Sequence, residues 1–233
     1  MTLTLAEEFL LLALKDDTGK PMVDGTKLGA ALAGAAIVEL TMDGALRLTE
    51  DGEADHRAGR LVETGERPAD PRLAELVQVA HGRKPKDAIG KIAGFSGWRS
   101  RARNLKEALL ADLAEAGVLH EEHGKVLGLF PTTAWMPGDP GLEAEVLARV
   151  RASAVDHAAP LDRTAALVSI LHAVDMLPKL FRDADRKALK RRGKEISEGD
   201  WGGEAVRKAV QQVQAVTVAV IVATSTSASA SGS

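Results

Sequence analysis

Three basic residues near the middle of the sequence have types and a spacing suited to binding phosphate. Arg99, Arg103 and Lys106 are four and three residues apart, so they share one face of a helix that we predict over 98–116. Guanidinium and ammonium groups clustered in this way bind phosphate through charge-assisted hydrogen bonds. Arg101 extends the patch to four charges, each contributing about 1 kcal/mol at an anionic membrane surface. The pattern predicts a site of useful but not tight affinity for anionic phospholipid headgroups.

A plainer interpretation of the same residues stays open. They would form a solvated helix face whose charges pair with neighbouring acids such as Glu107. Two other basic segments allow both interpretations. Residues 82–86 are predicted as a basic loop that extends the patch, and 186–194 most simply form the solvated face of another helix.

The remaining polar clusters do not predict catalysis or metal binding. The segment His120-Glu-Glu-His123 falls in a predicted hairpin turn, where its side chains would be solvated and scattered. His172 and Asp175 fit a hydrogen-bonded core pair better than a catalytic pair, because no nucleophile accompanies them. The chain has no Cys, no phosphate-cradling Gly motif and no Gly-x-Ser-x-Gly elbow. We therefore expect a protein that is not an enzyme, with no catalytic residue, metal or cofactor.

Composition narrows the class of protein further. The 233 residues are 45% hydrophobic and 27% charged, which is typical of a soluble globular chain. A net charge of −3 argues against coating nucleic acid by bulk electrostatics and leaves room for a local basic patch. The N-terminus has no basic segment before its apolar run, and the most apolar stretch, 215–223, is about half the ~20 residues of a spanning helix. We expect a cytoplasmic protein whose membrane contact is peripheral, on the inner face of the membrane.

Hydrophobic periodicity predicts a mainly α protein. We expect a single compact helical domain over 1–224, with a central helical bundle and one or two small β-hairpins, and a disordered Ser/Ala-rich tail at 225–233. The hairpins are predicted at 46–64 and 118–130, and a Pro/Gly-rich linker at 131–141. The predicted helices are 5–14, 27–42, 72–81, 98–116, 142–157, 163–175, 183–196 and 203–224.

Several segments, in order, resemble the Golgi phosphoprotein 3 family. The strongest are Leu3–Asp16 (LTLAEEFLLLALKD) and Leu32–Leu40 (LAGAAIVEL), followed by the short strand Gly44–Leu48. Further matches are Arg103–Lys106 through Gly117–Leu119, Phe130–Thr133, Asp162-Arg163 and Leu171–Leu177. Each motif alone is weak, but their common order covers roughly residues 2–222.

The resemblance implies a compact helical domain with a projecting hairpin. Eukaryotic members bind phosphatidylinositol-4-phosphate in a shallow basic pocket, sit on Golgi membranes and hold glycosyltransferase tails. By position, two pocket residues fall on Arg103 and Lys106, while the pocket Arg and Trp of the second helix fall on Ala33 and near Asp24. The resemblance therefore implies a lipid-binding adaptor with a protein cargo, in which two of four pocket positions differ.

By position, the family's hairpin falls on 118–130. In relatives it contributes to oligomerisation and membrane contact. The resemblance therefore implies a homo-oligomer contact through this hairpin, and the residues expected to touch the membrane or another copy are Val126, Leu127, Leu129, Phe130 and Trp135. Trp135 has two interpretations, since an aromatic ring in this segment would lie at a headgroup interface or fold back onto the core.

Two other functions compete with lipid binding. A helix followed by a hairpin occurs twice, at 27–64 and 98–130, which is the local pattern of a winged-helix nucleic-acid-binding protein. Against it, the first helix carries only Ala, Leu and Gly side chains where base-reading groups would be needed, so no nucleic acid is expected. The other alternative is a protein–protein scaffold whose lipid pocket has decayed, which the residues Ala33 and Asp24 favour.

Overall fold

A computed structural model describes residues 2–53, 57–68, 70–94, 101–126, 130–199 and 210–211. At 101–104, 124–126 and 130–132 it describes the backbone alone. Within these residues the chain forms nine helices and two small antiparallel hairpins, which confirms the mainly α class. The predicted helix at 203–224 lies outside the described residues except for 210–211, and the tail at 225–233 lies wholly outside them. The domain boundary at 224 stays a prediction.

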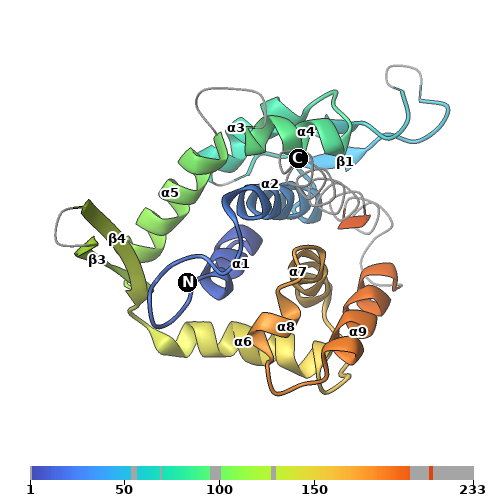
Figure 1. Ribbon diagram of the computed structural model, residues 1–233. Helices are drawn as coiled ribbons and strands as arrows, with labels where there is room; N and C mark the ends of the chain where they lie inside the picture. Colours follow the sequence, from blue (N-terminus) through green and yellow to red (C-terminus); the bar gives the residue numbers. More distant parts are fainter. Residues whose placement is uncertain are drawn as a thin grey trace, which may run out of the picture.

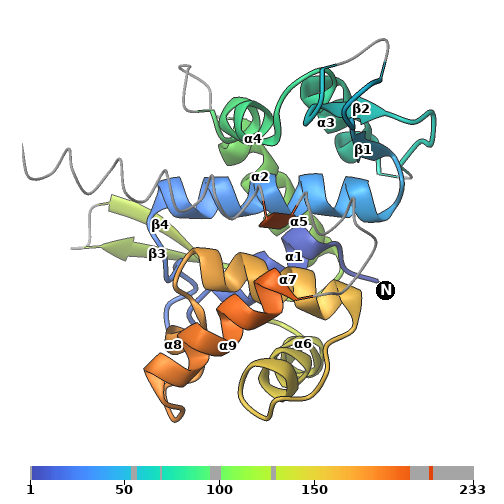
Figure 2. The ribbon, with the colours of Figure 1, turned by 90° about the vertical axis from the view of Figure 1, so that its right-hand side faces the viewer.

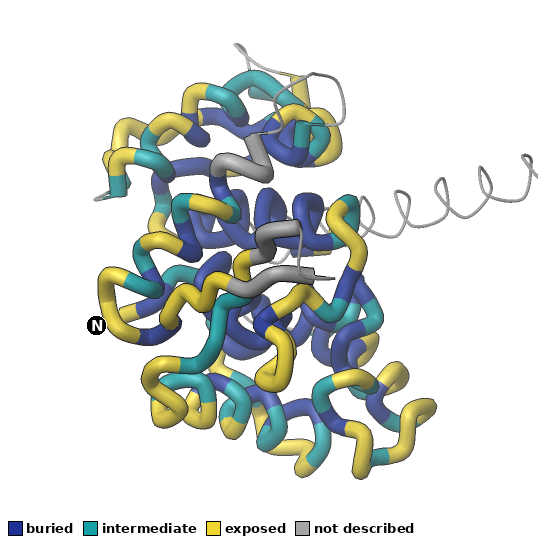
Figure 3. The backbone as a smooth tube through the Cα atoms, turned by 60° about the vertical axis from the view of Figure 1, so that its left-hand side comes forward, coloured by how far each residue is buried: buried dark blue, intermediate teal, exposed yellow. Residues whose placement is uncertain are grey.

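Helix α2, Gly25–Met42, runs through the centre of the molecule (Figure 1). Its sequence is apolar almost all round, and such a helix is stable only when neighbours cover every face. Helices α3 (Pro71–Ala80) and α4 (Pro85–Ala93) pack on one side of it, and α1 (Leu5–Ala13), α5 (Arg101–Glu115) and α7 (Asp162–Ala173) pack around the rest (Figure 2). Every residue of α2 from Leu28 to Thr41 is buried, as the dark central segment of Figure 3 shows.

The first helix begins at a capping box formed by Thr4 and Glu7, which have the three-residue spacing of that motif. The Thr4 hydroxyl accepts a hydrogen bond from Glu7 N, and the Glu7 carboxylate accepts one from Thr4 N at 2.7 Å. The two bonds satisfy amide groups that the first turn leaves unpaired. All residues of α1 are buried, including Glu7 and Glu8.

Four helices complete the outer layer. Three of them lie outside the buried α7 and pack against it: α6 (Pro140–Ala154), the single turn α8 (Leu177–Leu180) and α9 (Arg186–Glu198). The fourth, α7, connects them to the core. The segment 82–86 was predicted as a loop, which holds for 82–84, but the prediction was wrong at 85 and 86, which already belong to α4. Pro85 is the first residue of α4, where its missing N–H has no partner to lose, and Gly94 ends the helix in the left-handed conformation.

The second hairpin is longer than predicted. Strands β1 (Leu46–Leu48) and β2 (Leu61–Glu63) form the first hairpin as expected. Strands β3 (Leu119–Val126) and β4 (Phe130–Pro137) pair from Leu119↔Pro137 to Val126↔Phe130. The prediction of a linker at 131–141 was therefore wrong over 131–137 and also at 140–141, where α6 begins. The hairpin turn predicted around His120–His123 was wrong too, because these residues belong to β3. Both strands of a two-stranded sheet are edges, and an edge strand tolerates Pro.

Two buried carboxylates and two partly exposed arginines join four helices. We call Glu8, Glu39, Arg149 and Arg163 the core ion cluster. Glu8 Oε1 accepts hydrogen bonds from Arg149 Nη2 at 3.0 Å and Arg163 Nε at 3.2 Å. Arg163 Nη1 donates to Glu39 Oε1 at 2.9 Å, and Glu39 Oε2 accepts from the backbone N–H of Leu5 at 2.6 Å. The cluster ties α1, α2, α6 and α7 together with two carboxylates that are almost wholly buried.

No helix in the described ranges combines the length and apolar character needed to cross a membrane.

Candidate functional site

A groove lies where the base of the β3–β4 hairpin meets α5 and the loop between α1 and α2. We call it the hairpin groove, and its volume is about 330 Å³. This size is at the lower end of the roughly 300–1,000 Å³ usual for ligand pockets. Its lining residues are Leu10, Leu14, Gly19, Lys20, Pro21, Lys106, Glu107, Leu110, Glu121, Thr133 and Trp135.

The loop 15–21 is folded tightly so that Lys20 reaches this groove. The backbone N–H of Lys15 donates to Lys20 O at 3.0 Å, and Gly19 N–H donates to Lys15 O at 2.7 Å. Leu14 and Pro21 form an isolated β-bridge that closes the loop. The turn needs Gly19, whose φ of +57° lies in the left-handed region that Gly adopts without steric cost.

Gly19 also lets the loop touch the hairpin. A Cβ atom at this residue would lie 2.7 Å from the carbonyl carbon of Trp135, and nearer still to the backbone N and O of that residue. The two backbones therefore meet without any side chain between them. The Trp135 side chain is partly buried and packs against the core. This agrees with the interpretation in which the ring folds back onto the protein.

The groove brings together two ammonium groups, two carboxylates and one hydroxyl. Lys20 is exposed and Lys106 is half-buried, and no ion pair ties either ammonium group to an acid in the part of the chain that the structure describes. Glu121 lies opposite Trp135 in the hairpin and has His123 Nδ1 at 3.8 Å from its Oε1. Unpaired ammonium groups beside solvent are free to bind an anion.

The predicted basic stripe is placed only in part. Residues 101, 103 and 106 lie within the first two turns of α5, with 103 and 106 one turn apart, and Arg99 lies outside the described residues. Lys106 is the member of the stripe whose side chain is described, and it lines the hairpin groove. The headgroup role of Arg99, Arg101, Arg103 and Lys106 stays a prediction. Lys20 was not predicted, because only the folded loop brings it to the groove.

The predicted contact residues of the hairpin lie in two places. Val126 pairs with Phe130 at its end, while Leu127 and Leu129 lie outside the described residues. Trp135 lies nearer the base, where it lines the groove. Their contact with a membrane or another copy stays a prediction.

The two positions that depart from the family pattern have structural roles here. Ala33 is fully buried inside α2. Asp24 caps the same helix, and its Oδ1 accepts hydrogen bonds from Thr26 N at 3.1 Å and Lys27 N at 3.0 Å. Ala33 is therefore closed to a ligand, while the Asp24 side chain is 58% exposed and places a negative charge at the start of α2, where an Arg or Trp of the family pocket would favour an anion.

The His and acid motifs noted in the sequence are separated by the structure. His120 and Glu122 are 3.3 Å apart, while His123 pairs with Glu121, so the two pairs alternate along β3 and point to opposite faces. Asp175 pairs with Arg186 and Lys190 instead of His172. Burial lowers the pKa of His172. Within the described residues, no group of three His, Asp or Glu side chains is arranged to hold a metal ion.

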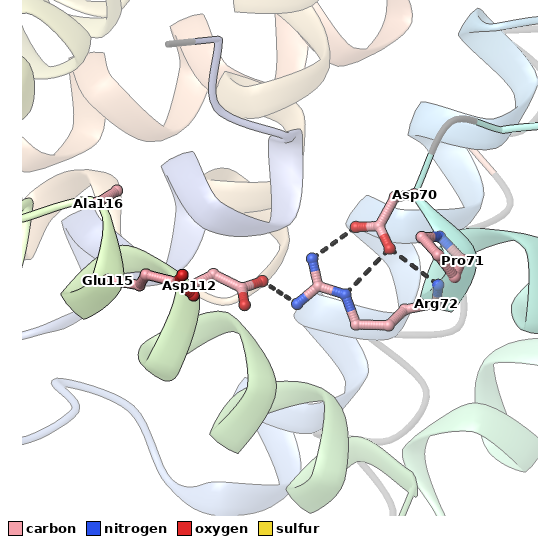
Figure 4. A pocket seen from close by; sticks show the side chains of 6 residues that line it. All are labelled: Asp70, Pro71, Arg72, Asp112, Glu115 and Ala116. Atoms are coloured by element: carbon pink, nitrogen blue, oxygen red, sulfur yellow. Dashed lines mark hydrogen bonds and ion pairs between the residues drawn. The ribbon is translucent and has the colours of Figure 1, made fainter.

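A larger hollow of about 590 Å³ lies between the start of α3 and the end of α5 (Figure 4). Arg72 occupies it and donates to Asp70 from Nε at 3.0 Å, while its Nη1 donates to Asp112. The hydrogen bond with Asp70 is the largest cause of a raised pKa for Arg72. The Arg72 guanidinium is bound by two carboxylates, so it joins α3 to α5 and is not free to bind an anionic ligand.

A third cavity, of about 550 Å³, lies on the other side of the loop 15–21. Asp16 from the loop and Glu143 from the first turn of α6 both line it, with cations from Lys15, Lys179 and Arg182 around them. Burial, and then the charge of Asp16, raise the pKa of Glu143 to about 7. Glu143 therefore titrates near neutral pH.

Replacing Glu143 by Gln should stabilise the protein at high pH. The folded state holds the Glu143 proton more tightly than the unfolded chain, so wild-type stability falls as pH rises from 4.5 to about 7. Since the side chain is half-exposed, we expect E143Q to gain only about 1 kcal/mol at pH 8 and nothing at pH 4. Urea unfolding at both pH values measures this, and an equal effect at both would contradict it.

The buried central helix, the hairpin at its side and the mixed-charge groove at the hairpin base define a class: a helical domain with a projecting hairpin and a mixed-charge groove at the base of that hairpin. A family model described as Golgi phosphoprotein 3 (GPP34) matches residues 5–213. The chain belongs to this family, which confirms the resemblance seen in the sequence. A curated relative, the vacuolar protein sorting-associated protein 74 of Eremothecium gossypii, is 25% identical over 209 residues. The match covers 79% of this chain and 63% of that relative's length.

Proposed function

We propose that the protein is a non-enzymatic adaptor that binds a membrane surface peripherally, through an anionic phospholipid headgroup held in the hairpin groove. The observation that carries this proposal is the presence of Lys20 and Lys106 in one groove, each without an ion pair among the described side chains. Two ammonium groups on different elements can bind one phosphate from two sides.

The surroundings of the groove support a membrane contact. The first two turns of α5 contain the sequence Arg-Ala-Arg-Asn-Leu-Lys-Glu, whose net charge is positive, so this edge of the molecule attracts an anionic surface. Trp135 lines the groove with its ring half-buried, a position in which an indole can lie at the level of the headgroups. The hairpin continues beyond Trp135 to the pair Val126↔Phe130.

The family and the relative support an adaptor role. The relative's name associates it with vacuolar protein sorting. We carry this over as a proposal, together with a protein cargo, a homo-oligomer contact through the hairpin and a place on the inner face of the membrane.

Reversing both groove cations should abolish vesicle binding. For K20E/K106E at about 0.1 M salt, we expect the bound fraction on anionic vesicles to fall at least tenfold, since two attractions of about 1 kcal/mol each become repulsions. Sedimentation with vesicles of neutral lipid plus 30% anionic lipid, on the order of cellular content, measures this.

The matched control is K187E/K194E, which reverses two exposed charges on α9, away from the groove. It should bind within about twofold of wild type, because surface charges beyond a Debye length are screened. If the groove variant and the control bind alike, the groove is not the headgroup site. If the wild-type protein binds no vesicle of any composition, the scaffold function replaces the proposal.

Nucleic-acid binding is less well supported than lipid binding. The helix before the first hairpin is α2, whose residues 28–41 are buried, so they present no side chain to a base edge. The helix before the second hairpin is α5, in which Leu105, Leu109, Leu110 and Leu113 are buried. These leucines commit one side of α5 to the core and leave only its other side for base contacts, so α5 is the better of the two candidates for a recognition helix.

A further inference from the structure

Helix α9 has a basic outer face that headgroup binding does not use. The inner side of the helix is buried at Leu189, Gly193 and Ile196. A Cβ atom at Gly193 would lie only 2.7 Å from His172 Nδ1, so α9 packs closely on α7 and its orientation is fixed. Five basic residues of the helix are exposed, and we call them the α9 basic face: Arg186, Lys187, Lys190, Arg191 and Lys194.

The order of charges along α9 is the reverse of the order that stabilises a helix. Residues 186–194 include six basic side chains and no acid, while the two acids of the helix, Glu195 and Glu198, come in the last turn. The partial charges at the helix ends favour acids in the first turn and bases in the last. The ion pairs four residues apart, Arg191 with Glu195 and Lys194 with Glu198, also place the base before the acid, which is the weaker direction.

This charge order is evidence for a binding role. A solvated face that served only to stabilise its helix would have its acids first and its bases last. Natural proteins depart from locally favoured patterns mainly at functional sites. The cations at the start of α9 and the positive end of the helix dipole instead act together, and both attract an anion.

The acids around the α9 basic face do not balance its charge. One carboxylate, Asp175, pairs with both Arg186 and Lys190, at 3.1 Å and 3.0 Å. The N-cap Asp185 uses its carboxylate on the backbone of the first turn. Lys187 has no ion pair among the residues that the structure describes. The two pairs farther along the helix are 3.8 Å long, and their side chains are half-exposed or more, so another carboxylate can replace their acids at little cost.

The position of the face separates the classes of anionic partner. In Figure 1 the β3–β4 hairpin and α9 lie on opposite sides of the molecule, so a flat membrane at the hairpin groove would not reach α9. The basic stretch 186–194 is only about 13 Å long. Acids flank it at 183 and 185 on one side and at 195 and 198 on the other, and they would repel an extended polyanion such as nucleic acid. A short run of carboxylates fits between them.

We propose that the α9 basic face is a docking surface for a partner protein, which binds it through a short segment rich in Asp and Glu. The carboxylates of this segment pair with Lys187 and take the places of Glu195 and Glu198 beside Arg191 and Lys194. The proposal gives the adaptor role a second surface, and it does not depend on the ligand of the hairpin groove.

Fluorescence anisotropy of the full chain with a labelled peptide of alternating Glu and Ser tests this surface. A peptide of about eight residues spans the basic stretch when extended. At about 0.1 M salt, K187E/K194E should bind it at least tenfold more weakly than wild type, because two attractions become repulsions. The matched control K84E/K91E reverses two exposed lysines at α4 and should stay within about twofold of wild type. Absence of binding by the wild type, or equal binding by wild type and K187E/K194E, would overturn the proposal.

A charge swap separates binding from helix stability. The variant K187E/E198K keeps the net charge and puts an acid in the first turn of α9 and a base in the last. It should unfold at the temperature of wild type or higher, yet bind the peptide at least about threefold more weakly. A lower unfolding temperature would contradict the argument from charge order, and unchanged peptide binding would overturn the docking surface.

The two surfaces fail independently. K20E/K106E should lose vesicle binding and keep the acidic peptide, and K187E/K194E should do the reverse. If K187E/K194E instead loses the binding of anionic vesicles or of generic double-stranded DNA, the face belongs to a membrane or to a nucleic acid, and the protein partner is overturned. Vesicle binding that resists K20E/K106E would remove the headgroup site and leave the α9 docking surface standing.

Discussion

Arg163→Ala is expected to lower the free energy of unfolding by about 3–5 kcal/mol. Arg163 donates to Glu8 at 3.2 Å and to Glu39 at 2.9 Å, and it also donates to the backbone carbonyl of Leu3. The side chains of Glu8 and Glu39 are only 5% and 9% exposed. Removing Arg163 takes a positively charged hydrogen-bond donor from two carboxylates that water barely reaches. Most of the lost stability is therefore the cost of keeping negative charge desolvated without that donor.

Urea unfolding monitored by circular dichroism at pH 7 measures this loss. The matched control is Lys194→Ala, which removes an exposed pair with Glu198 at 3.8 Å. Surface pairs of this kind contribute about 0–1 kcal/mol, so K194A should unfold close to wild type. Losses of equal size in the two variants would contradict the expectation that the core ion cluster contributes more to the free energy of unfolding than a surface pair. Arg163→Met, which keeps much of the apolar volume, should still lose stability, because Glu39 loses its only cation partner among the described residues and Glu8 keeps Arg149 alone.

Gly19→Ala is expected to destabilise the protein by about 2–4 kcal/mol. The φ of +57° is unfavourable for any residue with a Cβ, and the added atom would meet the backbone of Trp135. Since the obstacle is backbone, no rotation of a side chain can relieve the contact. The loop must move away from the hairpin, and Lys20 moves with it, so vesicle binding should fall together with stability.

Gly25→Ala provides the control for this substitution. Gly25 has open space around its Cβ position and no left-handed φ, and it lies in the first turn of α2. Alanine there should be neutral or stabilise by up to about 1 kcal/mol. Thermal unfolding and vesicle sedimentation of both variants separate the effects, and a G19A protein as stable as G25A would contradict the close approach of loop and hairpin.

Local patterns predicted most elements of the fold because they depend on neighbours in the sequence. The capping box of Thr4 and Glu7 and the all-apolar pattern of α2 both form the elements that they indicate. The prolines were harder to interpret. Pro85 begins a helix and Pro131 lies in an edge strand, two settings in which a missing N–H costs little, although both residues had indicated loops.

The candidate site was less predictable because its groups meet only in the folded protein. Lys106 was found from its place in a helical stripe, which is a local pattern. Lys20 follows a Gly in a polar segment, and only the turn of the loop and the contact of Gly19 with Trp135 bring it beside Lys106. Glu121 reaches the groove through strand pairing that extends beyond the predicted hairpin. Contacts of this kind have no signature in sequence spacing.

The loop 15–21 separates two cavities and lines both of them. Asp16 lines the cavity that contains Glu143, and Lys20 lines the hairpin groove. The hydrogen bond from Lys15 N to Lys20 O joins the two ends of the loop. We expect a loop whose two ends are hydrogen-bonded to each other to move as a unit. We therefore expect the protonation of Glu143 and the binding of a ligand in the hairpin groove to act on the same short loop.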